Sequence, residues 1–208
     1  MSEEMRPRLT AEERREQILA AASVVFGERG YAGGTTDAIA KEAGVSQAYV
    51  VRMFGGKENL FRAAADRAAA RVRFAFRDTI AGFRGDEDLD EKRLALSMAY
   101  IGLMADRGLL LTLLHLFSLG HDPVLGPVAR DCFLDVFRVV RDEAGFTGPE
   151  ATEFFSRGML TTVLLAMRIP DSAGRPEADE LMSCAFGERT TDLISLMQGQ
   201  VPLDDAAR

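Results

Sequence analysis

The chain has 208 residues, of which 47% are hydrophobic and 27% are charged, and its formal net charge is −7. These values are typical of a globular protein with a substantial core. The longest apolar runs are too short or too polar to cross a bilayer, and the acidic N-terminus lacks the apolar segment of a signal peptide. We therefore expect a cytoplasmic protein with no membrane partner.

Few residues are suited to metal binding or catalysis. Cys132 and Cys184 are far apart and form no CxxC pair, so we expect buried thiols. His115 and His121 are the other soft metal ligands, and their spacing does not suggest a metal site. The sequence contains no HExxH motif, nucleophile motif or phosphate-binding glycine loop. It therefore predicts no enzyme, no cofactor and no metal.

The first predicted helix follows Thr10, which forms a capping box with Glu13. It extends to about Glu28, and Gly30 ends it before a turn over residues 31–34. Its inner face is formed by apolar residues at helical spacing, namely Ile18, Leu19, Ala22, Val25 and Phe26.

Residues 36–54 predict two short helices joined by a tight turn. Thr36 is suited to cap the first, and Gly44 can adopt the left-handed conformation that ends it. Ser46 can cap the second, in which Val50 and Phe54 lie four residues apart on one apolar face. This spacing is typical of a helix-turn-helix, whose second helix is presented to the DNA major groove.

The rest of the chain is predicted to be helical, which makes the fold all-α. A long helix begins at Lys57 and extends to about Phe83, and a charged loop over residues 85–88 follows. No strand-like alternation is visible beyond that loop. Further helices are expected near 89–105, 108–119, 124–144, 149–168 and 177–198.

Basic residues are concentrated locally despite the acidic total. Between Ser46 and Arg77 there are seven basic residues and two acidic ones, Glu58 and Asp66. A local positive surface is what phosphate contact requires. The alternative for Arg62–Arg77 is an ordinary solvated arginine face, and we favour that interpretation.

A specific set of residues recurs in a fixed order and spacing between positions 10 and 61, namely Ile18–Ala22, Phe26–Tyr31, Thr35, Thr36, Ile39, Ala40, Ala43–Ser46, Phe54 and Lys57–Leu60. With them, residues 10–61 resemble the N-terminal domain of the tetracycline-repressor-like (TetR) family of bacterial transcription regulators. The resemblance implies a three-helix DNA-binding domain over residues 1–56, joined by a long helix to a ligand-binding and dimerisation domain over 57–208.

Carried over by position, the resemblance implies specific DNA contacts. Thr36 and Lys57 match phosphate contacts, whereas Gln47 and Ala48 match positions that face base edges. A glutamine can pair bidentately with adenine N6 and N7, and a helix N-terminus beside a lysine favours an anion.

The chain departs from the family's Leu-Tyr-x-His-Phe pattern, because Val51 stands at the tyrosine and Met53 at the histidine position. We hypothesise that Tyr49 and Arg52 make the backbone contact instead.

The resemblance also implies a homodimer formed by the last two long helices. Apolar residues at steps of three and four predict this surface, and they are Leu160, Val163, Leu164, Met167, Leu181 and Ala185. The alternative is that these faces close the core of one monomer. A two-fold axis suits the reading of a near-palindromic operator.

A pocket for a small-molecule effector is expected between the long helix and those after it. Its candidate walls are Phe74, Met98, Ile101, Met104, His115, Phe117 and Phe133, with Leu103, Leu113 and Leu116 as further apolar candidates and Ser97, Tyr100 and Thr112 as polar ones. Most such residues in a helical body belong to the core, and a lone histidine is more often a satisfied core residue than a ligand contact.

The sequence therefore predicts a ligand-responsive repressor that binds double-stranded operator DNA as a dimer and is released by a small lipophilic molecule. The alternative is a helical small-molecule-binding protein whose N-terminal domain no longer reads DNA.

Overall fold

The computed structural model describes residues 9–187, and every regular element in that range is helical. This confirms the predicted all-α fold for the described part of the chain. The longer helices are α1 (Ala11–Gly33), α2 (Thr36–Glu42), α3 (Gln47–Phe54), α4 (Lys57–Ala81), α5 (Leu89–Gly102), α6 (Arg107–Ser118), α7 (Leu125–Arg138), α8 (Gly148–Ala166) and α9 (Pro176–Phe186). Short helical segments follow three of them, at Leu103–Ala105, Val139–Glu143 and Ile169–Ser172.

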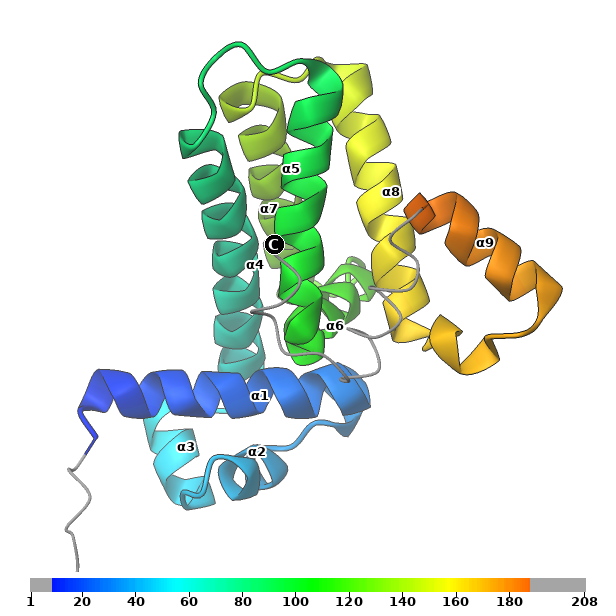
Figure 1. The fold of residues 1–208 in the computed structure, drawn as a ribbon. Coiled ribbons are helices and arrows are strands. Elements are labelled where there is room, and N and C mark those ends of the chain that lie inside the picture. Colours follow the sequence, from blue (N-terminus) through cyan, green and yellow to red (C-terminus); the bar gives the residue numbers. More distant parts are fainter. Residues whose placement is uncertain (1–8, 188–208) are drawn as a thin grey trace, which may run out of the picture.

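The helices form two parts, which Figure 1 shows from the side. Helix α1 lies across the base of the molecule with α2 and α3 beneath it, and we call these three helices the head. Helix α4 rises from the head, and α5, α7 and α8 stand beside it as an upright bundle. Helix α6 lies between this bundle and α1, and α9 projects outward beyond α8. We call α4–α9 the body.

Side-chain caps set where the head helices begin. The Thr10–Glu13 capping box is present, with Glu13 N 3.1 Å from Thr10 Oγ1 and Thr10 N 2.7 Å from a carboxylate oxygen of Glu13. The prediction that Thr36 caps α2 was wrong by one residue. Thr35 has the extended backbone that a cap needs, and its Oγ1 accepts a hydrogen bond from Ala38 N at 3.1 Å. Thr36 is the first residue of the helix itself.

The turn between α2 and α3 matches the predicted one. Gly44 has a φ of 63°, in the left-handed region that a residue with a Cβ avoids. Ser46 caps α3, since its Oγ accepts a hydrogen bond from Tyr49 N at 3.2 Å. Val50 and Phe54 are buried, so they fix α3 against the rest of the head.

One core runs through head and body. Phe26 of α1 and Phe61 of α4 are fully buried and pack edge to face, with ring centroids 4.9 Å apart. The first turns of α4 thus complete the core of the head. Farther along α4, Val72 and Phe76 are buried in the body.

Helices α1 and α6 cross with their main chains in contact. A Cβ atom added to Gly27 would lie 2.8 Å from Gly108 Cα, and one added to Gly108 would lie 2.7 Å from Ser23 O. Only glycines permit this approach. Nearby, Thr112 Oγ1 lies 3.3 Å from Ser23 O, and His115 Nε2 lies 3.3 Å from Gly27 O.

Most predicted helix ends lie within a few residues of those observed. Helix α1 is interrupted where expected, because Gly30 has φ 67° and ψ 178° and one further helical turn follows it. Helix α4 ends at Ala81, before the predicted Phe83. The last predicted helix, 177–198, corresponds to α9 as far as Phe186, and its remainder lies outside the described residues.

Within residues 9–187, no single helix is long and apolar enough to span a membrane. The segments Leu89–Ala105 and Arg107–Ser118 reach that length and composition only together, and they are bent by 101° where they meet. Leu109 and Leu116 of the second segment are fully buried inside the protein.

Candidate functional site

Helix α3 presents one free face. Gln47, Ala48, Val51 and Arg52 are exposed, and their spacing places them on the side opposite the buried residues of the helix. We call these four residues the outer face of α3. Figure 1 shows α3 at the lower surface of the molecule, where no other described helix covers it.

The amide of Gln47 is oriented by Thr36. Gln47 Nε2 donates a hydrogen bond to Thr36 Oγ1 at 3.0 Å, which ties the start of α3 to the start of α2. The nitrogen keeps a second proton, and Oε1 remains able to accept. Gln47 can therefore still offer a donor and an acceptor side by side. The Thr36 hydroxyl, having accepted one bond, can donate its own proton outward.

Tyr49 and Arg52 lie together on α3. The Arg52 guanidinium is 5.0 Å from the centroid of the Tyr49 ring, within the range of a cation–π contact. Arg52 is exposed and Tyr49 is half-buried. The ring thereby restricts the guanidinium to the edge of the outer face.

Lys57 is held at the junction between head and body. Its Nζ donates a hydrogen bond to Ala32 O at 3.0 Å and lies 4.8 Å from the centroid of the Tyr31 ring. These contacts place the ammonium beside the turn that precedes α2. Two of its three protons remain for other acceptors.

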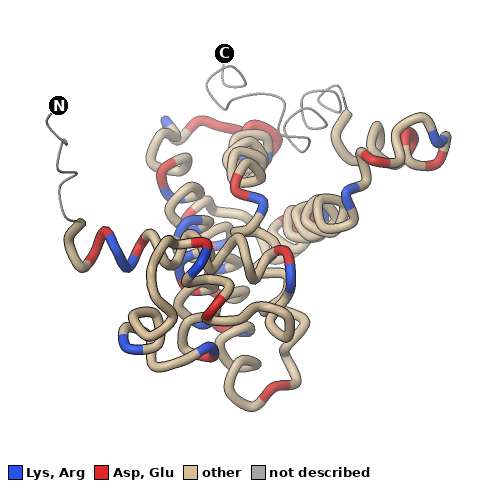
Figure 2. Tube along the Cα trace, turned by 90° about the horizontal axis from the view of Figure 1, so that it is seen from below, with Lys and Arg blue, Asp and Glu red and all other residues tan. Residues whose placement is uncertain are grey.

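Acidic and basic residues are intermixed on the lower surface of the molecule. Figure 2 shows Lys and Arg scattered among Asp and Glu there instead of forming one basic patch. Four arginines of α4 form ion pairs with acids elsewhere in the chain, so they do not form a free basic surface for phosphate. The ion pairs are Arg67–Glu16 at 2.5 Å, Arg71–Asp106 at 3.0 Å, Arg73–Asp135 at 4.0 Å and Arg77–Glu143 at 2.7 Å.

The body encloses an apolar cavity of about 190 Å³. Six helices contribute to its wall, from α4 to α9, and phenylalanines dominate it. Neighbouring rings pack edge to face, as Phe117 and Phe133 do with centroids 5.3 Å apart. The lining residues are Val72, Phe76, Ser97, Tyr100, Ile101, Leu113, Phe117, Phe133, Val136, Phe154, Phe155, Arg157, Gly158, Met159, Thr161, Ala185 and Phe186.

Only part of the predicted pocket lines this cavity. Ile101, Phe117 and Phe133 do, together with Ser97, Tyr100 and Leu113 from the wider set of candidates. Four predicted residues do not, namely Phe74, Met98, Met104 and His115.

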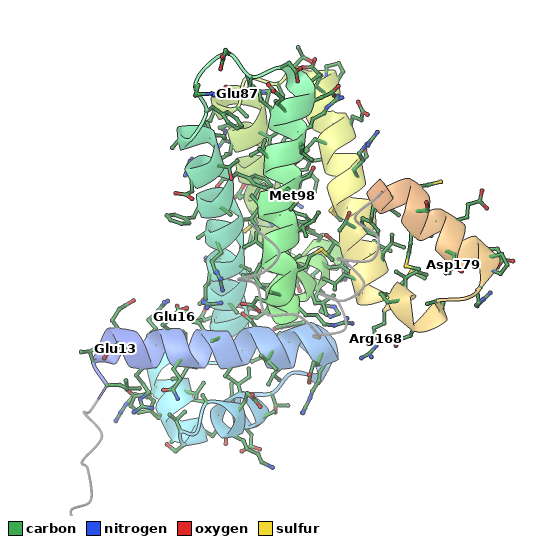
Figure 3. The ribbon with its side chains drawn as sticks, in the orientation of Figure 1. Glu13, Glu16, Glu87, Met98, Arg168 and Asp179 are labelled. Atoms are coloured by element: carbon green, nitrogen blue, oxygen red, sulfur yellow. The ribbon has the colours of Figure 1, made fainter. Side chains whose placement is uncertain are left out.

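Helical geometry explains these four exceptions. Phe74 lies two residues from both Val72 and Phe76, so it points away from them and is 72% exposed. Likewise, His115 lies two residues from Leu113 and Phe117 and faces α1. Met104 is packed into the core, and Met98 lies midway along α5, outside the cavity lining (Figure 3).

Several lining residues lie outside the predicted pocket. Phe154 and Phe155 of α8 are the largest, and Arg157 is the cavity's charged residue among those described. Two adjacent phenylalanines followed by Gly158, four residues after Phe154, are a signal that could have identified this wall. That glycine leaves space on the same helix face where Phe154 contributes a ring.

Tyr100 is one of the polar residues of the cavity wall. Its hydroxyl lies 2.5 Å from Thr162 Oγ1, which in turn donates to Gly158 O at 3.0 Å. Because the Thr162 proton is committed to Gly158, Tyr100 is the donor in the first bond. Burial raises the pKa of Tyr100, so its hydroxyl remains neutral.

Residues 18–64 match the sequence model of the bacterial regulatory proteins of the tetR family. The match covers α2 and α3 with most of α1 and the first residues of α4. Over 76 residues it is 42% identical to the HTH-type transcriptional activator FasR of Mycolicibacterium smegmatis, a match that covers 35% of each chain. The matched part thus spans about a third of that relative's length.

Solved structures of bacterial regulators share the fold of the described helices. A TetR-like transcriptional regulator from Rhodococcus sp. RHA1 superposes with a TM-score of 0.55 at 20% identity, covering 96% of this chain and 92% of the other. The fatty acid degradation regulator FadR from Bacillus halodurans gives a TM-score of 0.53 at 19% identity, covering 92% and 95%. At these identities the similarity is one of fold, and it includes the helices of the body.

The two departures from the tetR-family pattern have different surroundings. Val51 belongs to the outer face and is 42% exposed. Met53 is half-buried and packs against the hydrophobic core. The substitution at position 51 therefore alters the free surface of α3, whereas the one at position 53 mainly alters packing.

An apolar stripe runs along α8. Leu160, Val163 and Met167 are 40%, 38% and 65% exposed, and Leu181 on α9 is 38% exposed. Two residues of the predicted dimer surface lie elsewhere. Leu164 is buried at 2% exposure, and Ala185 lines the cavity. Figure 3 shows Arg168 and Asp179 on the adjoining segments of this projecting side.

Among residues 9–187, no group of three or more His, Cys, Asp or Glu side chains is placed to hold a metal ion. Cys132 is buried and Cys184 is exposed, so the expectation that both thiols are buried was half wrong.

Proposed function

We propose that the protein is a DNA-binding transcription regulator. In this proposal, residues 1–56 read an operator, and residues 57–208 bind an effector and pair two copies of the chain. The observation that carries it is the outer face of α3, whose four residues are exposed on the helix that a helix-turn-helix presents to DNA.

Each residue of the head has a proposed role. Gln47 would pair with an adenine through its amide, and the exposed Val51 would contact a thymine methyl group. Ala48 is small enough to let the helix approach the base edges closely. Thr36, Lys57 and the Tyr49–Arg52 pair would bind phosphates, which position the helix without reading sequence.

The body would form a dimer through the α8 stripe and Leu181. Exposed apolar side chains in a row are poorly explained by a monomer in water, and a two-fold axis would bury each stripe against its copy. The two α3 helices would then reach half-sites about 34–36 Å apart.

Effector binding would change DNA affinity through α4. This helix contributes Val72 and Phe76 to the cavity wall and Phe61 to the core of the head. A ligand that fits the cavity better in one tilt of α4 shifts the population towards that tilt and away from the half-site spacing. The coupling is reciprocal, so operator DNA would weaken ligand binding by the same factor. We propose that the regulator is a repressor released in this way.

The test is selection of bound duplexes from a random pool, followed by gel shift against scrambled competitor at moderate salt. We expect an enriched near-palindrome with adenine at the position facing Gln47. Arg52→Ala should weaken binding and reduce the salt slope by about one, since one phosphate contact is lost. Arg138→Ala, on α7, is the matched control.

No preference for any duplex would contradict the proposal. Effector binding without duplex preference would instead identify a helical small-molecule-binding protein whose head does not read DNA. A transcription assay with the selected operator tests repression separately, since the relative FasR is named an activator.

A further inference from the structure

We infer that the effector is a compact monocarboxylate whose apolar body fills the phenylalanine-lined cavity and whose carboxylate is bound by Arg157. The inference rests on the proposed function only in treating this cavity as the effector site. It deepens that proposal by stating the ligand's size, its charge and the residue that binds its head group.

The size follows from the volume of the cavity. A cavity of about 150 Å³ lined by aliphatic and aromatic side chains can hold a benzene molecule. The cavity here, at about 190 Å³, has room for one ring with a short tail or for a chain of similar bulk. A long acyl chain exceeds that volume.

The lining sets the chemistry of the ligand's body. Six phenylalanines contribute to the wall, and their edge-to-face arrangement offers both ring faces and ring edges to a bound group. The Tyr100 hydroxyl donates to Thr162 and so has no proton to offer a ligand in this arrangement. Among the described lining residues no acid is present, so no anionic group repels a carboxylate.

Arg157 lies where a negatively charged head group would sit. It is the charged member of the described lining, and Ser97 and Thr161 add hydroxyl groups to the wall. The Thr161 hydroxyl donates to Arg157 O at 2.9 Å and has no proton left for a carboxylate, so the guanidinium of Arg157 is the main donor on this side of the wall. The Arg157 side chain is 79% exposed, so its guanidinium is in contact with solvent although the residue also lines the cavity.

Arg157 can change partner at little cost. Its present partner is Glu153, four residues earlier on α8, at 3.2 Å. An exposed pair of this kind contributes little to stability. Glu153 has a shorter ion pair with Arg93 at 2.8 Å, so it stays paired when Arg157 turns to a ligand. A guanidinium can then bind the ligand's carboxylate through two parallel hydrogen bonds.

The test compares 4-phenylbutyrate with 4-phenylbutyramide, which has the same shape without the charge. Isothermal titration calorimetry on the full chain should show the acid binding about five- to tenfold more tightly than the amide. Arg157→Gln should abolish that difference while leaving amide binding unchanged. Arg138→Gln, an arginine of similar exposure on α7 with its own acidic partner, should preserve it. Thermal melts of both variants confirm that they fold.

A second comparison tests size. Octanoate should bind with an affinity similar to that of 4-phenylbutyrate, whereas palmitate should not bind in the same concentration range. Equal affinity for acid and amide in the unaltered protein would overturn the inference, as would tighter binding of palmitate or no binding of any probe.

Because these titrations contain no DNA, they are independent of the proposed function. Gel shift of the selected operator with and without 4-phenylbutyrate tests the effector role. Binding that leaves operator affinity unchanged would support the ligand chemistry and contradict the regulatory role of the cavity.

Discussion

The hydrogen bond from Gln47 Nε2 to Thr36 Oγ1 fixes how the amide of Gln47 is presented on the outer face of α3. A glutamine held in one orientation can match the adjacent acceptor and donor of adenine without first losing side-chain freedom. We therefore expect Thr36 to position Gln47, in addition to its predicted phosphate contact.

Thr36→Val should reduce the preference for adenine opposite Gln47 by about three- to tenfold, the value of one lost hydrogen bond. Gel shift with the selected operator and a variant carrying guanine at that position measures the preference. Thr36→Ser retains the hydroxyl and should retain the preference. An equal loss of affinity for both operators in Thr36→Val would mean that Thr36 contacts only phosphate.

Cys132 should be unreactive in the folded protein. It is buried, with Sγ 3.8 Å from Asp66 Oδ1, and burial is the main cause that raises its pKa to about 11. The thiolate is the reactive form, so little is present near neutral pH. In Cys184→Ser, a disulfide reagent should modify no thiol in the native state and one after denaturation. Rapid native labelling of that variant would show that Cys132 is accessible.

For single residues, the sequence predicted the features that depend only on neighbouring positions in the chain. The burial of Val50 and Phe54 follows from their spacing, and the conformation of Gly44 follows from its lack of a Cβ. The partner of His115 could not be predicted, because it is a main-chain carbonyl on α1, brought close only by folding. The choice between Thr35 and Thr36 as the cap of α2 depends on backbone angles that two adjacent threonines leave open.

At the scale of elements, the α1–α6 crossing depends on its two glycines. A methyl group at Gly27 would meet the Gly108 main chain at 2.8 Å, and main chain cannot move aside as a flexible side chain can. Gly27→Ala should lower the free energy of unfolding by about 1–3 kcal/mol, as overpacking does elsewhere.

Gly102→Ala is the control for this change. No atom lies within 4 Å of a Cβ built there, and the residue has helical backbone angles. Its substitution should be neutral or stabilise by up to about 1 kcal/mol through helix propensity. Urea unfolding of both variants measures the difference, and equal stabilities would show that the helices can separate at no cost.

The helices themselves could be predicted better than the cavity they enclose. Helix type follows from apolar spacing and caps along one segment, whereas the cavity wall combines side chains from six helices. Phe74 and Phe76 are the same residue type on one helix, and only their direction separates an exposed ring from a lining one. That direction is known once the neighbours of α4 are known.

For the whole molecule, the exposed stripe on α8 predicts the assembly. Val163→Glu places a charge at the centre of the proposed interface, where burial without a partner is costly. Sedimentation should show a dimer for the unaltered chain and a monomer for Val163→Glu, with a matching loss of operator affinity. Leu134→Glu, on α7 and 53% exposed, should remain dimeric. A monomer mass at all concentrations of the unaltered protein would refute the assembly.

The head is attached to the body at two separate places. The first attachment is α4, whose first turns belong to the core of the head. The second is the crossing of α6 with α1, where Gly108 contacts Gly27. With a single attachment the head could rotate relative to the body about any axis. With two attachments it can rotate only about the line that joins them. A change in cavity shape that shifts α4 relative to α6 would therefore reach α3 as a directed swing, with the fold of the head kept intact.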